Sequence, residues 1–213
     1  MRVEPYGDGA LYVDLEIDDA PDRAARTHAV AAALRERLPQ ADIVIGAGSV
    51  ALVGLGAWDD VEALVAGAMR GPLRSPERTS VHAIEAVYDG PDLDEVASLA
   101  GLRPSEVVEL HASREYVVEL VGFLPGFAYL ASVDRRLVVA RRAVPRPRVE
   151  AGSLGIAGHH TGIYPLASPG GWRIIGRVLH AKLFDAARQP PALFAPGDRV
   201  RFVPRATGAS GRA

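Results

Sequence analysis

Arginine side chains are concentrated in the segment 135–148, which contains Arg135, Arg136, Arg141, Arg142, Arg146 and Arg148. Such a run is usually a solvated face, but here Val144, Pro145 and Pro147 interrupt it. Because alternate residues of an extended segment share a face, Arg146 and Arg148 could point in the same direction. Guanidinium groups bind carboxylate and phosphate in a bidentate manner, so the segment is a candidate site for an anionic substrate or an acyl phosphate.

Glycine and imidazole groups dominate the segment 152–172, which reads GSLGIAGHHTGIYPLASPGGW. Free backbone N–H groups in glycine-rich loops can form anion-binding nests. His159 and His160 would point to opposite faces of an extended segment, and no third ligand has metal-like spacing, so we expect no metal site. His111 lies at the end of a predicted helical hairpin, where a satisfied hydrogen-bonding histidine is commoner than a base.

Aromatic side chains and glycines surround one proline in the segment 122–130, which reads GFLPGFAYL. Glycine lets the backbone approach a ligand closely. Phe123, Phe127 and Tyr129 could form an apolar wall, with the Tyr129 hydroxyl as its polar group. The alternative is a core turn whose aromatic rings simply pack against one another. The two interpretations differ in whether a ligand can reach the rings.

A small α+β domain is predicted for residues 1–76. Hydrophobic alternation and β-prone composition predict strands at 10–17, 43–45 and 50–55. Apolar residues at helical spacing predict helices at 24–38 and 61–68, with Pro21 in the first turn of one and Asp59 as the cap of the other. Two helices packed on a few-stranded sheet would bury these residues. The composition GPLRSPE predicts a linker at 71–77.

A mainly β domain is predicted for residues 77–207, followed by a disordered tail at 208–213. Strands are expected at 81–88, 116–121, 137–140, 172–177 and 200–204. Glycine- and proline-rich connections join the later strands, and many short strands of this kind favour a closed or nearly closed barrel. The predicted fold class is therefore α+β, with a small N-terminal α+β domain and a C-terminal β-barrel domain.

Two short helices are expected between Pro91 and Ser113, with Gly101 ending the first and Pro104 opening the second. This hairpin resembles a helix-turn-helix, so DNA binding must be weighed. The segment 91–115 contains six acidic residues, Glu115 included, against two arginines. Such a surface would repel phosphates, which supply most non-specific DNA affinity. We therefore expect a hairpin that caps the barrel, with no nucleic-acid partner.

Composition excludes several classes of protein. The net charge is −2, so no global basic excess would recruit nucleic acid or an anionic membrane. The chain has no cysteine, which rules out disulfides, thiolate nucleophiles and cysteine metal sites. Neither a signal peptide nor a membrane-spanning apolar stretch is present in the sequence, so we expect a cytoplasmic protein. No P-loop and no G-x-S-x-G motif occurs.

Motifs that occur in a fixed order carry a family resemblance: GFLPGFAYL, RRAVPRPRV, GIAGHHTGIYP, SPGGWRIIGR and PGDRVRFVP. Together they resemble the family called allophanate hydrolase subunit 1. That family includes the B subunit of the prokaryotic 5-oxoprolinase, the kinase inhibitor KipI and part of the carboxyltransferase region of urea carboxylase. The resemblance covers about residues 5–205 and is dense over 88–204. Where the family usually has glycine and then glutamine, this chain has His159 and His160, and the imidazole could alter substrate choice.

The resemblance implies a small α+β domain followed by a cyclophilin-like β-barrel. It also implies a subunit of an amide or lactam hydrolase, inactive alone, of the 5-oxoprolinase or allophanate-hydrolase type. Its partners would be a second barrel subunit (allophanate hydrolase subunit 2, or the C subunit of 5-oxoprolinase) and a third 5-oxoprolinase component. The assembled complex would use ATP to cleave a small amide. A KipI-like regulatory module that inhibits a sensor histidine kinase is the alternative hypothesis.

The enzyme hypothesis gives roles to residues of each motif. Arg146 and Arg148 would hold a substrate carboxylate or phosphate. His111 or His160 would be the acid–base group, because histidine titrates near neutrality. Donors to a polarised carbonyl oxygen would be Gly152, Ser153, Thr161 and Gly162. The remaining substrate-binding residues would be Phe123, Pro125, Gly126, Phe127, Tyr129, Tyr164, Gly170 and Gly171.

Overall fold

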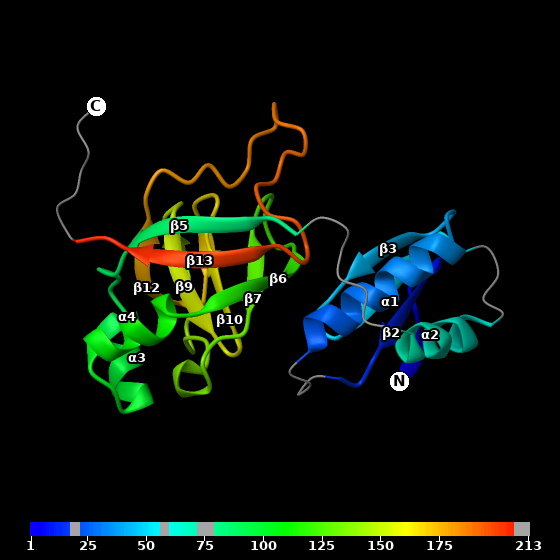
Figure 1. Cartoon of the computed structure of the whole chain (residues 1–213), viewed down its shortest axis with the longest axis horizontal. Helices are drawn as coiled ribbons and strands as arrows, with labels where there is room; N and C mark the ends of the chain where they lie inside the picture. Colours follow the sequence, from blue (N-terminus) through cyan, green and yellow to red (C-terminus); the bar gives the residue numbers. More distant parts are fainter. Residues whose placement is uncertain (18–21, 56–59, 72–78, 207–213) are drawn as a thin grey trace. The chain divides into compact units, whose positions relative to one another are not determined.

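The computed structural model describes residues 1–17, 22–55, 60–71 and 79–206 of the chain. The chain divides into two compact units, Met1–Thr79 and Ser80–Ala213 (Figure 1). Several sequence predictions lie outside the described residues, namely those for Pro21, Asp59, the tail at 208–213 and, except for Gly71, the linker at 71–77. None of the helices in the described ranges is long and apolar enough to cross a membrane.

The first unit is a four-stranded antiparallel sheet packed against two helices (Figure 1). The strand order is β1 (Arg2–Tyr6), β2 (Ala10–Asp14), β4 (Ser49–Val53) and β3 (Asp42–Ile45), and the helices are α1 (Arg23–Arg37) and α2 (Val61–Arg70). Alternate residues Leu11 and Val13 of β2 are buried together with Leu34 of α1 and Val65 of α2. The predicted two helices on a small sheet are confirmed, and β1 is an additional strand.

The second unit is built on a closed barrel of seven strands, which confirms the predicted α+β fold class. Around the barrel the order is β10 (His160–Ile163), β7 (Ala128–Ala131), β6 (Glu115–Val121), β13 (Arg199–Pro204), β5 (Val81–Val87), β12 (Arg173–Val178) and β9 (Ser153–Ala157). Every pairing is antiparallel except β5 with β13, which is parallel. The predicted strand at 137–140 is wrong, because Arg135–Leu137 forms a 3-10 turn, η1, and Val139 makes only an isolated bridge to Gly158.

The barrel interior is filled by packed side chains, including Val118, Leu130, Ile156, Ile175 and Phe202. A barrel of this size leaves room for side chains rather than for a channel. The helical hairpin α3 (Leu93–Ala100) and α4 (Pro104–Ala112) adds its own buried residues to the same core. As predicted, Gly101 ends α3 in the left-handed conformation, with φ +67°, and Pro104 is the first residue of α4.

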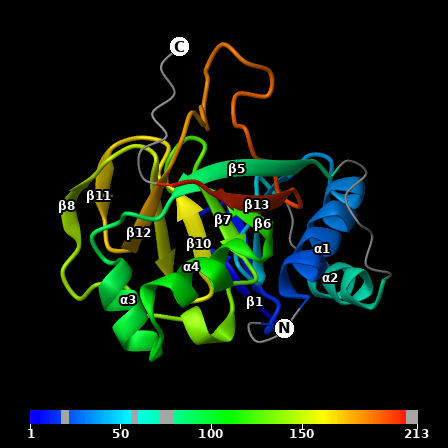
Figure 2. The ribbon, with the colours of Figure 1, turned by 60° about the vertical axis from the view of Figure 1, so that its left-hand side comes forward.

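A second layer lies on the outer face of the barrel wall. Ala128 and Leu130 of β7 point into the barrel core, whereas Tyr129 of β7 and Phe127, the residue before the strand, belong to a separate cluster on the other face. Two short strands, β8 (Arg146–Val149) and β11 (Ser168–Gly170), pair as a ribbon beside this wall (Figure 2). Val149 of β8 packs into the outer cluster. The aromatic motif residues Phe127, Tyr129, Tyr164 and Trp172 therefore lie on the outside of the wall.

Candidate functional site

Five aromatic residues form what we call the outer-wall cluster: Phe123, Phe127, Tyr129, Tyr164 and Trp172. Phe127 lies at its centre, with ring centroids 5.1 Å from Tyr129, 5.3 Å from Trp172, 5.4 Å from Phe123 and 5.5 Å from Tyr164. Each of these pairs is edge-to-face, the geometry that aromatic quadrupoles favour. Phe127, Tyr164 and Trp172 are buried, whereas Phe123 is 59% exposed. A ligand can therefore reach the cluster only at its edge, beside Phe123 and the half-buried Tyr129.

Two glycines make this packing possible. A Cβ on Gly162 would lie 2.9 Å from the Ala128 carbonyl oxygen and 3.1 Å from the rings of both Phe127 and Trp172. A Cβ on Gly170 would collide with the Tyr164 hydroxyl. Both residues, predicted to bind substrate, therefore serve close packing of aromatic rings on backbone.

His160 lies at the edge of the outer-wall cluster, with its ring 5.6 Å from that of Tyr129. Its Nε2 is 2.5 Å from Oε2 of Glu119, whose side chain is fully buried. Glu119 occupies a register shift between Val118 and Leu120 of β6, and such a bulge can re-aim a side chain that regular alternation would point elsewhere. A carboxylate thus orients the His160 imidazole, and 17% of that side chain remains exposed. His159, its neighbour, is exposed.

His111 lies instead inside the barrel, fully buried. Its Nδ1 is 2.8 Å from the Tyr88 hydroxyl, and its Nε2 is 2.9 Å from Thr161 Oγ1. Burial lowers the pKa of His111 to about 3, so its ring is neutral at physiological pH. These features argue against the predicted role of His111 as an acid–base group: both ring nitrogens are bonded to the protein and the ring resists protonation.

The predicted donors to a carbonyl oxygen are also already bonded within the protein. The Gly152 N–H donates to the Tyr164 carbonyl at 2.7 Å, and the Ser153 N–H donates to the Glu150 carbonyl at 3.2 Å. Gly162 pairs with Gly155 in the ladder between β10 and β9, and Thr161 is fully buried. An oxyanion site needs donors aimed at an open position, and these four residues do not form one.

Arg146 points to a carboxylate of the same chain. Its Nη1 and Nη2 donate to the two oxygens of Asp92, at 2.8 and 2.6 Å. Arg142 and the Ile174 amide donate to the same carboxylate, at 3.0 and 2.6 Å. Burial alone would raise the pKa of Asp92, but the hydrogen bonds from Arg146 and Ile174 outweigh it and hold the pKa below its usual value. The Arg146 guanidinium, predicted to bind a substrate anion, is therefore occupied by Asp92. This ion pair links β8 to the start of α3.

Arg148 does not share the direction of Arg146. It pairs with Glu150 at 2.6 Å on the surface, where both side chains are 68% exposed. The remaining predicted residues are Pro125, which is exposed, Gly126, which turns with φ +81° against Phe184, and Gly171, whose carbonyl accepts from Arg142. The predicted arginine pair and glycine donors therefore do not converge on one concave site.

Three residues of this region are absent from the predicted set: Glu119, Asp92 and Trp172. For Glu119 the signal was a single carboxylate within the apolar strand sequence YVVELV. Such a group must be paired if it is buried. The sequence around Asp92 gives no indication of its role, because its hydrogen-bond partners lie far along the chain, in β8 and β12. Across the described ranges, no group of three or more potential ligands is placed to hold a metal ion.

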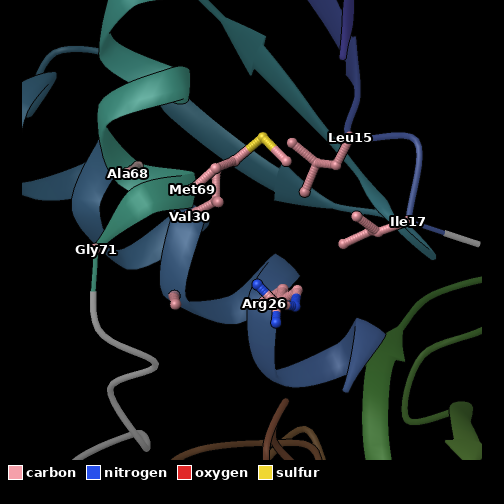
Figure 3. A pocket seen from close by; sticks show the side chains of 8 residues that line it. Leu15, Ile17, Arg26, Val30, Ala68, Met69 and Gly71 are labelled. Carbon is pink, nitrogen blue, oxygen red and sulfur yellow. The ribbon is translucent and has the colours of Figure 1, made fainter. Parts of the chain in front are cut away.

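A pocket also lies in the first unit, between the end of β2 and the helices α1 and α2 (Figure 3). Its walls are mainly apolar, with Leu15, Ile17, Val30 and Met69 among the lining residues. Among the described lining residues the one charged group is Arg26, which is paired with Asp22 at 2.8 Å. Because the described lining residues include no nucleophile or acid–base group, we do not take this pocket as a candidate for hydrolysis.

Comparison with known proteins agrees with the motifs. The family described as carboxyltransferase domain, subdomain C and D, matches residues 1–194. The B subunit of 5-oxoprolinase from Escherichia coli O157:H7 is 49% identical over 154 residues, 71% of this chain and 65% of that protein. The protein of the same name from Bacillus subtilis (strain 168) is 48% identical over 114 residues, 54% of this chain and 47% of that protein. The chain thus matches less than two thirds of either relative.

The fold agrees as well. The crystal structure of TTHA0988 superposes with a TM-score of 0.75 and 37% identity, covering 95% of this chain and 41% of that one. By sequence and by fold, this chain belongs to the carboxyltransferase-domain family, subdomains C and D, together with the 5-oxoprolinase B subunits that it matches.

Proposed function

We propose that this chain is the B subunit of a 5-oxoprolinase-type enzyme, an ATP-dependent hydrolase of a lactam or a related small amide. One observation carries the proposal beyond family membership. Phe127 and Tyr129, Tyr164, and Trp172 come from three separate motifs of the family, and they meet in a single cluster on the barrel wall. Packing alone does not require that motifs so distant in sequence share one small surface.

The outer-wall cluster is suited to a small, flat amide. Aromatic edges and faces favour planar groups, and the Tyr129 hydroxyl offers a hydrogen bond at the accessible edge. Of the two histidines predicted for proton transfer, only His160 lies at that edge and reaches solvent, with Glu119 orienting it. We therefore keep His160 as the acid–base candidate and Phe123, Tyr129 and His160 as the substrate-facing edge.

ATP is proposed for the assembled complex and not for this chain. Two features support this assignment: the sequence has no P-loop, and Arg136, Arg142, Arg146 and Arg148 are already engaged by carboxylates of this chain. The proposed partners are a second barrel protein, equivalent to the C subunit of 5-oxoprolinase, and a third component that would handle ATP. An enzyme that depends on ATP in this way is expected in the cytoplasm.

The test is ATP-dependent conversion of 5-oxoproline to glutamate by the chain co-expressed with its two partners. We expect turnover only with all three proteins. His160→Ala should lower turnover about a hundredfold or more, the size typical of lost acid–base catalysis, and His159→Ala should not. Phe123→Ala should raise KM, whereas Leu99→Ala, a matched control with 58% exposure on α3, should leave it unchanged. Absence of amide turnover, with co-purification of a sensor histidine kinase, would favour the regulatory alternative.

A further inference from the structure

The outer-wall cluster packs against a patch of backbone without side chains, formed by Gly155 and Gly162, which we call the glycine floor. Gly155 of β9 and Gly162 of β10 lie opposite each other in the strand register. A Cβ on Gly155 would be 3.2 Å from Cβ of Trp172, and a Cβ on Gly162 would be 3.1 Å from the rings of Phe127 and Trp172. Glycine within a strand has no side chain to pack and weakens that strand. The two strands under the cluster therefore need another source of rigidity.

A hydrogen-bonded chain inside the barrel supplies that rigidity from the opposite face. The Thr161 hydroxyl donates to the Gly155 carbonyl at 2.9 Å, and so joins β10 to β9 beside both glycines. A hydroxyl has one hydrogen, so Thr161 must accept the bond from His111 Nε2, at 2.9 Å. The neutral ring then accepts at Nδ1 from the Tyr88 hydroxyl, at 2.8 Å. Each of the three hydrogens of this buried chain therefore has an acceptor.

We propose that Tyr88, His111 and Thr161 are positioning residues, which hold the glycine floor at the height that the outer-wall cluster needs to bind substrate. The substrate part of this inference rests on the proposed function. His111 is fixed as the Nε2–H tautomer, which is the only one that satisfies both neighbours. Loss of the Thr161 hydroxyl would remove this side-chain bond and leave the backbone ladder as the remaining link between β9 and β10 at the two glycines. The rings of Phe127 and Trp172 would then pack on a less rigid surface.

Tyr116 offers a matched control. Its hydroxyl is also buried in the barrel and donates to the same residue, but to the His111 main-chain carbonyl, at 2.8 Å. Tyr116→Phe should therefore cost about as much stability as Thr161→Val, because each removes one buried hydrogen bond. Only Thr161→Val breaks the link to the glycine floor.

In the assembled three-protein enzyme, Thr161→Val should raise KM for 5-oxoproline about threefold to tenfold, the factor that one hydrogen bond is worth. Thr161→Ser, which keeps the hydroxyl, should restore the parental KM, and Tyr116→Phe should leave KM unchanged. Equal KM values for Thr161→Val and the parent would overturn the proposal. So would an equal rise in Thr161→Val and Tyr116→Phe, which would report stability alone.

A second measurement needs no substrate. The sequence has two tryptophans, Trp58 and Trp172, so Trp58→Phe leaves Trp172 as the reporter. In that background, acrylamide should quench Trp172, now only 5% exposed, more strongly after Thr161→Val than after Tyr116→Phe. Equal quenching would overturn the inference. Because this assay uses the full chain alone, a parental complex without 5-oxoproline turnover would refute the proposed function and leave the positioning role still measurable.

Discussion

The carboxylate of Asp92 offers the sharpest test of how the second unit is held together. Its side chain is 3% exposed and accepts hydrogen bonds from both terminal nitrogens of Arg146, from one nitrogen of Arg142 and from the Ile174 amide. Asp92→Asn keeps the shape, removes the charge and turns an NH2 group toward guanidinium donors. Breaking a buried ion pair costs about 3–5 kcal/mol, because the remaining charge is left uncompensated. Arg146 is 24% exposed and can be partly rehydrated, so we expect the lower end, about 3 kcal/mol.

Thermal unfolding measures this directly. For a chain of this size a loss of about 3 kcal/mol lowers Tm by roughly 6–12 °C. Glu150→Gln is the matched control, because Arg148 and Glu150 form the same kind of pair with both side chains 68% exposed. Exposed pairs contribute about 0–1 kcal/mol, so the control should lose no more than roughly 2–4 °C. If the two variants lose the same Tm, the account of Asp92 is wrong.

The stability difference between the parent and Asp92→Asn should also change with pH in a defined direction. The pKa of Asp92 is lower in the folded chain than in the unfolded one, so its stabilisation is present above the unfolded pKa of about 3.9. It is lost as the pH falls below that value toward the folded pKa. The difference between parent and Asp92→Asn should therefore be constant from about pH 5 to 8 and shrink below about pH 4. A difference that grows on acidification would refute the reasoning.

Three further predictions concern single side chains. His111 has a folded pKa of about 3, below its unfolded value of about 6.5, so below that pH the unfolded chain binds one more proton than the folded chain. The free energy of unfolding should therefore fall by about 2 kcal/mol between about pH 7 and pH 5. In urea unfolding, His111→Gln should lack this fall. Gly162→Ala should lower the free energy of unfolding by about 1–3 kcal/mol, because the added methyl group overpacks the cluster. Gly67→Ala should raise it by about 0.5–1 kcal/mol, because Gly67 lies in α2 and a Cβ there meets no atom within 4 Å. A destabilised Gly67→Ala would contradict this reasoning. Arg148→Ala should change the unfolding free energy by less than about 1 kcal/mol in the same urea assay, and a larger loss would show that the pair is not solvated.

Elements set by local rules were predictable from the sequence. The hairpin α3–α4 follows from a glycine that tolerates the left-handed conformation and from a proline that suits a first helical turn, and both occur where expected. The aromatic motif residues Phe127, Tyr129 and Tyr164 do meet. By contrast, the apolar run 137–140 has the composition of a strand, yet the Asp134 side chain accepts the Arg136 N–H and caps a turn there.

The errors in the site came from partners that lie far apart in the sequence. Arg146 and Asp92 are separated by 54 positions, and His160 and Glu119 by 41. A sequence pattern shows that a guanidinium or an imidazole is present, but not which carboxylate the fold will bring to it. The bulge that places Glu119 beside His160 is a shift in strand register, and the alternation of residue types along the strand does not indicate it.

The parallel pairing of β5 with β13 has a consequence for biosynthesis. These are the first and last strands of the second unit, and β13 fills the gap between β5 and β6. During translation, β5 emerges early but cannot be paired on that side until the segment ending at Pro204 has left the ribosome. Until then, the unpaired backbone N–H and C=O groups on that edge of β5 are exposed to other proteins in the cell. A chaperone that shields this edge should therefore improve the yield of the newly made chain more than it protects the finished barrel.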